Sequence, residues 1–394
     1  MRRLLSLATL YPNAHSPRFG TFVARSLESL AARGDWLVTV INPIGLPPLL
    51  YGHYRELALA ATNGETNRVE IYRPTFRLLP GLSGNWNARL IARKILPLAR
   101  HLHQAAPFDL VDAQFFYPDG PAAARIAADL GVPLAIKARG ADISYWGGRR
   151  SPLRQMRKAA RRADRLLAVS DALANDMEAL GFPAEKVRVH YTGLDRDLFR
   201  PLDRFECRVR LAEHFGFALP PGAPLLACVG ALIPRKGQAF AIEALPAFPE
   251  AHLLLVGKGP DEARLRALAD RLGVAGRVHL LGSLDHTLLP VLLSAADAMV
   301  LPSASEGLAN AWVEAVACGC PLVTTDVGGA RELVRSEAAG TIVARDAGAI
   351  ATALKALLAH PPDRDAVAAT AERFSWPAHA EALAGLYEDI VETS

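Results

Sequence analysis

Short apolar runs alternate with stretches of helical period along most of the chain. The strand candidates of the second half are 225–232, 252–259, 277–283, 298–303, 321–328 and 341–345. Helical patterns lie between them, for instance at 262–274 and 311–319. Several of the runs are almost continuously apolar, which is typical of strands that are covered on both faces. The alternation predicts a parallel, doubly wound sheet.

The first half repeats this pattern less cleanly. Its strand candidates are 4–12, 36–44, 69–76, 109–116, 133–140, 165–170 and 186–193. Its helix candidates are 21–34, 86–104, 121–131, 150–164 and 171–181. Segment 46–68 has no clear period and is predicted to be a long loop. Segment 195–206 breaks both periods and carries a proline, so we place the domain boundary there, between 198 and 199.

These patterns predict an α/β fold in which two Rossmann-like, doubly wound domains face each other across a cleft. Ligands of such sheets bind beyond the carboxyl ends of the strands. The loops that follow strands are therefore where we look for chemistry.

Composition and charge narrow the function classes. Of 394 residues 51% are hydrophobic, which excludes a disordered chain. No run of 18 apolar residues occurs, and the start reads as a buried strand rather than a signal peptide. The four cysteines form no CxxC pair, which favours a cytoplasmic setting. Residues 1–200 carry 28 Lys and Arg against 17 Asp and Glu, and residues 201–394 carry 16 against 23. The first half thus has a net charge of +11 and the second −7, which suggests that one half faces an anionic partner.

Glycine motifs exclude two common classes. No GxGxxG follows the first strand and no GxxxxGK[ST] occurs, so we expect neither a dinucleotide dehydrogenase nor a P-loop NTPase. Gly257 and Gly259 form a lone Gly-x-Gly, which we interpret as a tight turn between a strand and a helix.

Segment 303–321 leaves a strand, turns at Gly307 and enters a helix. Backbone N–H groups at that helix start would bind an anion, assisted by the helix dipole. Glu314 lies in an otherwise apolar helix, where a carboxylate needs hydrogen bonds. A ribose diol would supply two donors; a cap on neighbouring backbone is the alternative. Glu306, at the turn, is either a dipole partner of the helix or a contact to sugar hydroxyls.

Two other loops carry suitable groups. Arg235 and Lys236 follow a strand and precede a helix, which suits a diphosphate, although an exposed pair on any turn would look the same. Gly328 and Gly329 allow the backbone to approach a ligand closely before the next helix begins, although a simple turn would also account for them.

In this order, RKG, VGKGP, EG with a second Glu eight residues after the first, and GG-x-x-E resemble the family 4 retaining glycosyltransferases of the GT-B fold. The segments 166–199 and 374–390 resemble the family's entry into the second domain and its final helix, which returns to the first domain. The resemblance thus implies a first domain of 1–198 with 376–394 and a second domain of 199–375. The stretch YPDGPAAARIAADLGVPLAIKARGADI and the start of the chain are similar to a branch that builds bacterial surface polysaccharides.

The resemblance implies a role for each matching position. Glu314 would hold the donor ribose, and Arg235 and Lys236 would neutralise the diphosphate. Glu306 would contact the donor sugar. The remaining donor-binding positions lie on glycine-rich or helix-start loops: Gly20, Gly230, Gly307, Leu308 and Ala309.

Two positions depart from the family. Where many members carry His beside the reacting sugar, this chain has Arg139, which cannot act as a general base but could bind an acceptor anion or the leaving phosphate. Where some relatives place another Arg after the phosphate-loop glycine, it has Ala231. Phosphate binding would then depend on Arg235 and Lys236.

The reaction implied is sugar transfer from a nucleotide diphosphate to a hydroxyl of a glycan or lipid-linked acceptor, with retention of configuration. The resemblance favours front-face displacement. No Asp-x-Asp motif stands at a strand end, so we expect no metal and no other cofactor. A nucleotide-sugar 2-epimerase and a non-catalytic sugar-nucleotide-binding subunit remain as alternatives.

A basic amphipathic helix is predicted at 149–165. Arg150, Arg154, Arg157, Lys158, Arg161 and Arg165 recur at helical spacing, opposite a stripe of Leu153, Met156, Ala160, Ala163 and Leu167. It is either the solvated face of a helix packed on the core or a contact to anionic lipid headgroups. The second interpretation would make the protein cytoplasmic and peripheral at the inner face of the membrane. No aromatic platform accompanies the charges, so nucleic acid is not an expected partner.

Overall fold

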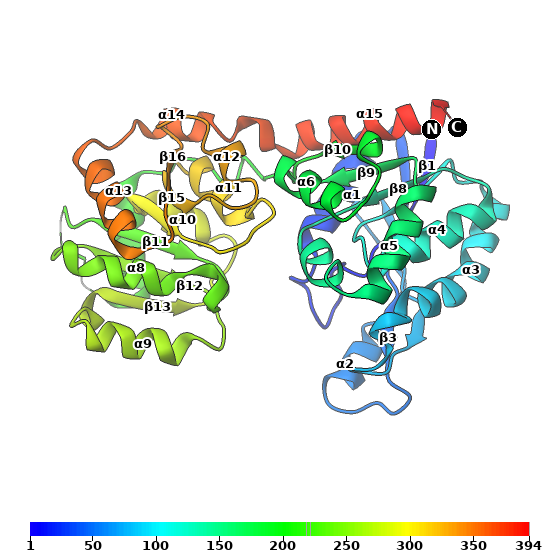
Figure 1. Ribbon diagram of the computed structural model, residues 1–394, viewed down its shortest axis with the longest axis horizontal. Coiled ribbons are helices and arrows are strands. Elements are labelled where there is room, and N and C mark those ends of the chain that lie inside the picture. The colour runs from blue at the N-terminus through cyan, green and yellow to red at the C-terminus, as the bar shows by residue number, and fades with distance from the viewer. Residues whose placement is uncertain (218, 221, 394) are drawn as a thin grey trace. The chain divides into compact units, whose positions relative to one another are not determined.

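The computed structural model describes residues 1–217, 219–220 and 222–393. It is an α/β protein with two compact units, drawn in Figure 1. The first unit is Met1–Gly193 together with the chain from Trp376 onward, and the second is Leu194–Ser375. The division lies between Gly193 and Leu194, five residues before the boundary expected from the sequence.

The sheet of the first unit has the strand order β10-β9-β8-β7-β1-β2-β5-β4, and all its pairs are parallel except β4 with β5. Leu4 of β1 pairs with Val38 of β2 on one side and with Leu110 of β7 on the other. The winding direction reverses at β1, so the switch point lies between β1 and β7. The strands are β1 (Arg2–Leu7), β2 (Trp36–Ile41), β4 (Gly64–Thr66), β5 (Val69–Tyr72), β7 (Leu110–Ala113), β8 (Leu134–Lys137), β9 (Arg165–Ala168) and β10 (Val187–Val189).

Helices cover both faces of this sheet (Figure 1). One hydrophobic cluster joins the sheet to α3 (Asn87–Ala105), α4 (Asp119–Leu130) and α5 (Arg150–Arg162). The other joins it to α1 (Thr21–Ala32) and the C-terminal helix α15 (Trp376–Thr393). Helix α6 (Asp171–Ala179) begins at Ser170, whose hydroxyl accepts from the Leu173 amide at 3.1 Å and so caps the helix.

Segment 46–68 is not the loop that the sequence predicted. It contains helix α2 (His53–Leu59) and strand β4, and a two-stranded ribbon of β3 (Ile44–Leu46) with β6 (Thr75–Arg77) lies next to it. No α2 residue is fully buried, and the helix has only seven residues, so the apolar stripe of Tyr54, Leu57 and Ala58 is too short for its period to be detected. The predicted basic helix also ends earlier than expected: Ala163 is extended, and Arg165 and Leu167 belong to β9.

The sheet of the second unit is entirely parallel, with the order β13-β12-β11-β14-β15-β16. Its switch point therefore lies between β11 and β14. The strands are β11 (Leu225–Val229), β12 (His252–Val256), β13 (Val278–Gly282), β14 (Ala298–Leu301), β15 (Leu322–Thr325) and β16 (Gly340–Val343). The helices are α7 (Arg204–Phe215), α8 (Gln238–Ala244), α9 (Glu262–Arg271), α10 (Leu289–Ala295), α11 (Asn310–Ala317), α12 (Ala330–Leu333), α13 (Ala347–Ala359) and α14 (Arg364–Ala369).

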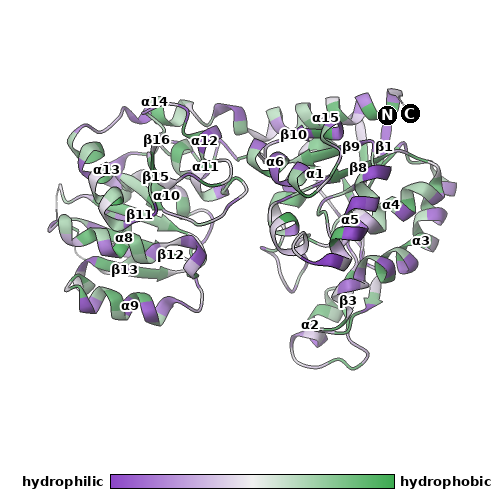
Figure 2. Ribbon diagram, in the orientation of Figure 1, coloured by the Kyte–Doolittle hydropathy of each residue, from purple (hydrophilic) through white to green (hydrophobic). Residues whose placement is uncertain are grey.

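The hydropathy of the elements follows the sequence pattern. In Figure 2 the strands are mostly hydrophobic and the helices alternate between hydrophobic and hydrophilic residues. All of β11, β12, β14 and β15 is buried, as near-continuous apolar runs predict. Within the described residues, no helix combines the length and apolar composition that a membrane crossing requires.

Candidate active site

The chemistry-bearing loops of the second unit follow β11 and β14, the two strands at the switch point. The carboxyl ends of parallel strands meet at one edge of a sheet, so these two loops lie together. They interlock through the backbone: the Ala304 amide donates to the Arg235 carbonyl at 2.7 Å. Arg345, which follows β16, donates from Nε to the Pro302 carbonyl and from Nη2 to the Pro234 carbonyl, both at 2.8 Å.

Three of the predicted residues meet in one ion cluster at this edge. Lys236 Nζ lies 2.5 Å from Glu306 Oε1, and Arg235 Nη1 lies 3.7 Å from Glu306 Oε2. The Glu306 side chain is 8% exposed and that of Lys236 14%, whereas Arg235 is 47% exposed. Arg235 also donates to the Ser305 carbonyl. The sequence suggested Arg235 and Lys236 as one group and Glu306 as another; the structure joins them.

The turn after β14 presents backbone donors beside this cluster. Among the described residues, none accepts a hydrogen bond from the amides of Gly307, Leu308 or Ala309, and α11 begins directly afterwards at Asn310. Gly328 packs against this turn with φ +53°, where a Cβ would lie 2.2 Å from the Glu306 carbonyl oxygen. The Gly329 amide donates to the Gly307 carbonyl at 2.6 Å. The paired glycines thus support the turn that could hold an anion.

Glu314 lies on α11 and is half-buried. Its carboxylate has no hydrogen-bond partner or ion-pair partner in the part of the chain that the structure describes, which argues against the capping interpretation. Burial raises the pKa of Glu314 from 4.5 to about 7. A carboxylate in this position gains from any ligand that supplies donors.

Gly230 and the lone Gly-x-Gly have packing roles. The aliphatic part of Lys236 lies over Gly230, whose Cβ would be 3.6 Å from Lys236 Cδ. Gly257, at φ +144°, lies against the Gly230 carbonyl, and Gly259 lies against the backbone of Leu232. The interpretation of Gly257 and Gly259 as a tight turn agrees with this close backbone packing.

In the first unit, Arg139 follows β8 and is held in a buried setting. Its Nη2 donates to Gln114 Oε1 at 2.6 Å and its Nε to the Gln114 carbonyl at 3.2 Å. The Asp142 carboxylate accepts from the Arg139 amide at 3.0 Å and from the Gly140 amide at 2.8 Å. Burial lowers the pKa of Arg139 to about 10, partly offset by Asp142, so the guanidinium stays charged at neutral pH.

A buried network that the sequence did not reveal lies beneath Arg139. Gln114 Nε2 donates to Asp112 Oδ2 at 2.5 Å, and the Tyr387 hydroxyl on α15 donates to the same oxygen at 2.5 Å. Burial raises the pKa of Asp112. The network therefore connects Arg139, through two side chains of the sheet, to the C-terminal helix. Gln114 and Asp112 are neighbours, but Arg139 lies 25 residues from Gln114 and Tyr387 lies 275 residues from Asp112, so no motif could indicate the network.

A second group of buried polar side chains includes His379 of the same helix, α15. Lys137 Nζ and His190 Nδ1 are 2.6 Å apart, and His379 on α15 lies 2.6 Å from the Ser26 hydroxyl. Burial lowers the pKa of Lys137 well below its usual range.

Gly20 has a steric reason for being glycine. It precedes α1 with φ +72°, and a Cβ there would lie 2.5 Å from the Leu10 carbonyl carbon. Across the described chain, no three His, Cys, Asp or Glu side chains are grouped as a metal site. The expectation that no metal takes part stays a prediction.

Two family models match the chain. The glycosyl transferases group 1 model matches residues 209–374, and the glycosyltransferase family 4 model matches residues 20–198. The D-inositol 3-phosphate glycosyltransferase of Mycobacterium tuberculosis (strain ATCC 25618 / H37Rv) is 32% identical over 311 residues, which is 73% of this chain and 63% of that relative. The chain therefore spans less than two thirds of the relative's length.

Solved structures resemble the chain over its whole length. Anabaena Alr3699/HepE in complex with UDP has a TM-score of 0.74 at 21% identity, covering 99% of this chain and 100% of that one. Sucrose-phosphate synthase (tll1590) from Thermosynechococcus elongatus has a TM-score of 0.78 at 20% identity, covering 100% of both chains. At this identity the likeness concerns the fold.

The two Rossmann-like units, one with a mostly parallel and one with an entirely parallel sheet between helices, define the GT-B class of fold. Within that class, the chain belongs to the family 4 glycosyltransferases.

Proposed function

We propose that the protein is a retaining glycosyltransferase that moves a sugar from a nucleotide-diphosphate donor to a hydroxyl of a glycan or lipid-linked acceptor, in surface polysaccharide synthesis. The observation that carries this proposal is the cluster of Arg235, Lys236 and Glu306 at the switch point of the second sheet. It is supported by the structural neighbour HepE, whose complexes contain UDP and UDP-glucose. The matched relatives are named as transferases, which favours this reaction over the epimerase alternative.

In the proposed reaction, the bond between the anomeric carbon and the β-phosphate oxygen breaks. A bond to the acceptor oxygen forms on the same face, and the acceptor proton passes to the leaving diphosphate. The departing oxygen gains negative charge, so fixed cations and amides accelerate the step by electrostatic preorganisation. Arg235, Lys236 and the amides of Gly307, Leu308 and Ala309 would supply that positive potential without a metal ion.

Glu306 has a definite place in this scheme. Its carboxylate pairs with Lys236 and lies near Arg235. A diphosphate that binds these cations competes with Glu306, which is then released to accept hydrogen bonds from donor sugar hydroxyls. Glu314 would accept from the ribose diol, and Arg139, held by Gln114, would bind an anion of the acceptor or the leaving phosphate.

The test begins with a thermal-shift screen of the purified chain against UDP-, GDP- and ADP-sugars, because bound ligand stabilises the fold. Donor hydrolysis without acceptor is then followed by NMR. Transfer predicts free sugar whose first-formed anomer matches the donor. A binding subunit gives no turnover, and an epimerase gives an isomerised donor. Activity that survives EDTA would agree with a metal-free mechanism.

A second part of the proposal concerns the membrane. The α5 residues Arg150, Arg154 and Lys158 are exposed, and no carboxylate of the described chain lies within ion-pair distance of them. Apolar side chains lie next to this helix: Leu82 is 71% exposed and Trp86 59%. Their loop contacts α5 through Gln155 Nε2, which donates to the Asn85 carbonyl at 2.9 Å.

Exposed Trp and Leu beside Arg and Lys are the composition of an element that lies in the headgroup region of a bilayer. We propose a cytoplasmic protein that is peripheral at the inner face of the membrane, and this composition supports the membrane contact. Sedimentation with vesicles of anionic phosphatidylglycerol at low salt tests this, with neutral phosphatidylcholine vesicles as the control. If the protein fails to sediment with the anionic vesicles, the membrane proposal is contradicted and the transferase proposal is unaffected.

A further inference from the structure

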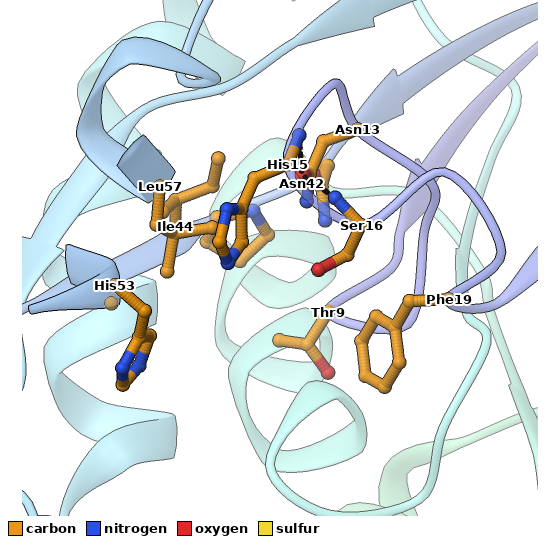
Figure 3. A pocket seen from close by; sticks show the side chains of 11 residues that line it. Thr9, Asn13, His15, Ser16, Phe19, Asn42, Ile44, His53 and Leu57 are labelled. Atoms are coloured by element: carbon orange, nitrogen blue, oxygen red, sulfur yellow. Dashed lines mark hydrogen bonds between the residues drawn. The ribbon is translucent and has the colours of Figure 1, made fainter. Parts of the chain in front are cut away.

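The first unit contains a pocket of about 300 Å³ at the carboxyl ends of β1 and β2. Figure 3 shows its walls. One wall is the loop between β1 and α1, with Thr9, His15 and Phe19. The other is formed by the segment after β2 and by α2, which contributes His53 and Leu57. The pocket lies at the carboxyl edge of the sheet, where ligands of such sheets bind, on the β2 side of β1 and next to the switch point between β1 and β7.

The walls are held in place by internal hydrogen bonds. Asn13 Oδ1 accepts from the His15 amide at 3.0 Å and from the Ser16 amide at 2.9 Å, which fixes the turn between β1 and α1. The Thr9 amide donates to Asp119 Oδ2 at 2.9 Å. His15 Nδ1 lies 3.2 Å from Glu56 Oε2, which ties the loop to α2. The pocket is therefore a built site rather than a gap between two independent loops.

Asn42, which also lines the pocket, is 2% exposed and only partly satisfied. Its Nδ2 donates to the Ala8 carbonyl at 2.7 Å, while its Oδ1 is buried and has no partner among the described residues. Asn42 therefore adds an amide group to the wall of the pocket.

The chemistry of the lining indicates an uncharged ligand. The side chains are imidazoles, hydroxyls and amides together with Phe19, Ile44 and Leu57, and the lining contains no Lys, Arg, Asp or Glu. Phe19 is 50% exposed and offers an apolar face. Hydroxyl groups of a sugar both donate and accept, and the C–H face of its ring packs on an aromatic surface. A site for a phosphate or carboxylate would instead present Arg or Lys.

The size agrees with a single ring. Small-molecule sites range from roughly 300 to 1,000 Å³, so this pocket lies at the lower limit. We propose that it binds the acceptor as a neutral, hydroxyl-rich saccharide ring, with α2 as the specificity element. This inference rests on the proposed transferase function. The positive charge of the first unit then serves a part of the acceptor, or a surface, outside this pocket.

The first experiment compares matched ligands with the wild-type chain by saturation-transfer NMR. Glucose, galactose and N-acetylglucosamine are the neutral probes, and their 6-phosphates are the charged counterparts. We expect at least one neutral sugar to bind, and its charged counterpart to bind at least fivefold more weakly. Equal or tighter binding of the charged compounds overturns the inference.

The second experiment tests the location. His53→Ala is expected to raise the acceptor KM at least tenfold with little change in the donor KM, because His53 lines the pocket from α2. His101→Ala, on the exposed face of α3, is the control and is expected to leave both KM values unchanged. An unchanged acceptor KM in His53→Ala refutes this site. If the wild-type chain neither binds a nucleotide nor turns over a donor, the proposed function fails; if it does both and binds no neutral sugar, only the pocket inference fails.

Discussion

The two sheets carry arginines at their carboxyl edges in opposite electrostatic settings. Arg235 is 47% exposed and shares the Glu306 carboxylate with Lys236, so a phosphate can take over these cations. Arg139 is half-buried, and its guanidinium is held by Gln114. The first arrangement suits cations that bind a substrate phosphate in place of Glu306 and return to Glu306 when the product leaves. The second arrangement suits a cation whose position must not change.

The two arginines also differ in what supports them. The cluster of the second unit is made by two loops at one switch point, with residues 70 apart in sequence. The position of Arg139 depends on Asp112 and, through it, on Tyr387 of the C-terminal helix. Substitutions in the cluster of the second unit should therefore lower the rate of transfer. Substitutions in the network of the first unit should change both the stability of the fold and the position of Arg139.

The largest effect is expected from Lys236→Met, which removes a cation that a substrate phosphate would bind in place of Glu306. Removing a preorganised charge that stabilises a developing anion lowers kcat by about 100- to 1,000-fold. It also leaves Glu306 buried, with Arg235 3.7 Å away as its remaining cation. Steady-state transfer and urea unfolding measure the two consequences. Lys355→Met, on an exposed position of α13, is the control.

Adding Glu306→Gln to Lys236→Met separates these consequences. Removal of the uncompensated carboxylate should recover most of the lost stability, because a single buried charge is far less favourable than a removed pair. Activity should stay low. Recovery of activity in the double variant would show that Lys236 serves only to neutralise Glu306.

The second largest effect is expected from Tyr387→Phe, which tests the network that holds Arg139 in place. The variant removes the hydroxyl donor of Asp112, a buried carboxyl, and should lower the free energy of unfolding by about 1–3 kcal/mol. Gln114 and Arg139 then lose a common anchor, so the acceptor KM should rise more than the donor KM. Tyr72→Phe is the matched control, since its hydroxyl donates to Glu70 at the surface, at 2.7 Å. Equal destabilisation in both variants would contradict the network.

The position of each element and residue in the fold explains what the sequence could and could not predict. Strands such as β12 and β14 were found because they are uninterrupted apolar runs. Helix α2 was missed because it has only seven residues and none of them is fully buried. Arg235, Lys236 and Glu306 were each singled out from local motifs, but their ion cluster was not foreseen, because it requires the strand order of the sheet. Gln114, Asp112 and Tyr387 lie in no motif, so only the packing of α15 on the first sheet reveals them.

The pH dependence of donor binding gives a smaller and graded effect. Burial raises the pKa of Glu314 to about 7, so the carboxyl is protonated below that pH and charged above it. The carboxylate accepts from a ribose diol better than the neutral acid does, so nucleotide-sugar affinity should fall as the pH drops from 8 to 6. Linkage limits the fall to about tenfold per pH unit. Calorimetric titration of a nucleotide sugar, whose diphosphate does not itself titrate between pH 6 and 8, should show a flat profile across this range in Glu314→Gln.

The pH dependence that Glu314 gives to stability has the opposite sign to the one it gives to donor binding. In the unfolded chain the Glu314 carboxyl has its ordinary pKa of 4.5, so the folded state binds the proton more tightly. Without ligand, the contribution of Glu314 to stability is then lost as the pH rises from 4.5 to about 7. A wild-type chain that loses no stability relative to Glu314→Gln over this range would contradict a raised pKa.

The smallest effect per residue is expected from Arg154 and Lys158 on the surface of α5, which are exposed and have no carboxylate of the described chain within ion-pair distance. Arg154→Gln and Lys158→Gln should change the free energy of unfolding by less than about 0.5 kcal/mol. Each nearby cation contributes about 1 kcal/mol to binding of an anionic membrane, so each substitution should weaken vesicle partitioning about fivefold. Arg266→Gln, on α9 of the second unit, is the control, because its partner Glu262 already neutralises it at 2.9 Å. If Arg154→Gln and Arg266→Gln weaken partitioning equally, the attraction comes from net charge and α5 is not the contact. If only the α5 variants weaken it, the positive charge of the first unit divides into a half-buried cation for the reaction, Arg139, and surface cations for the membrane.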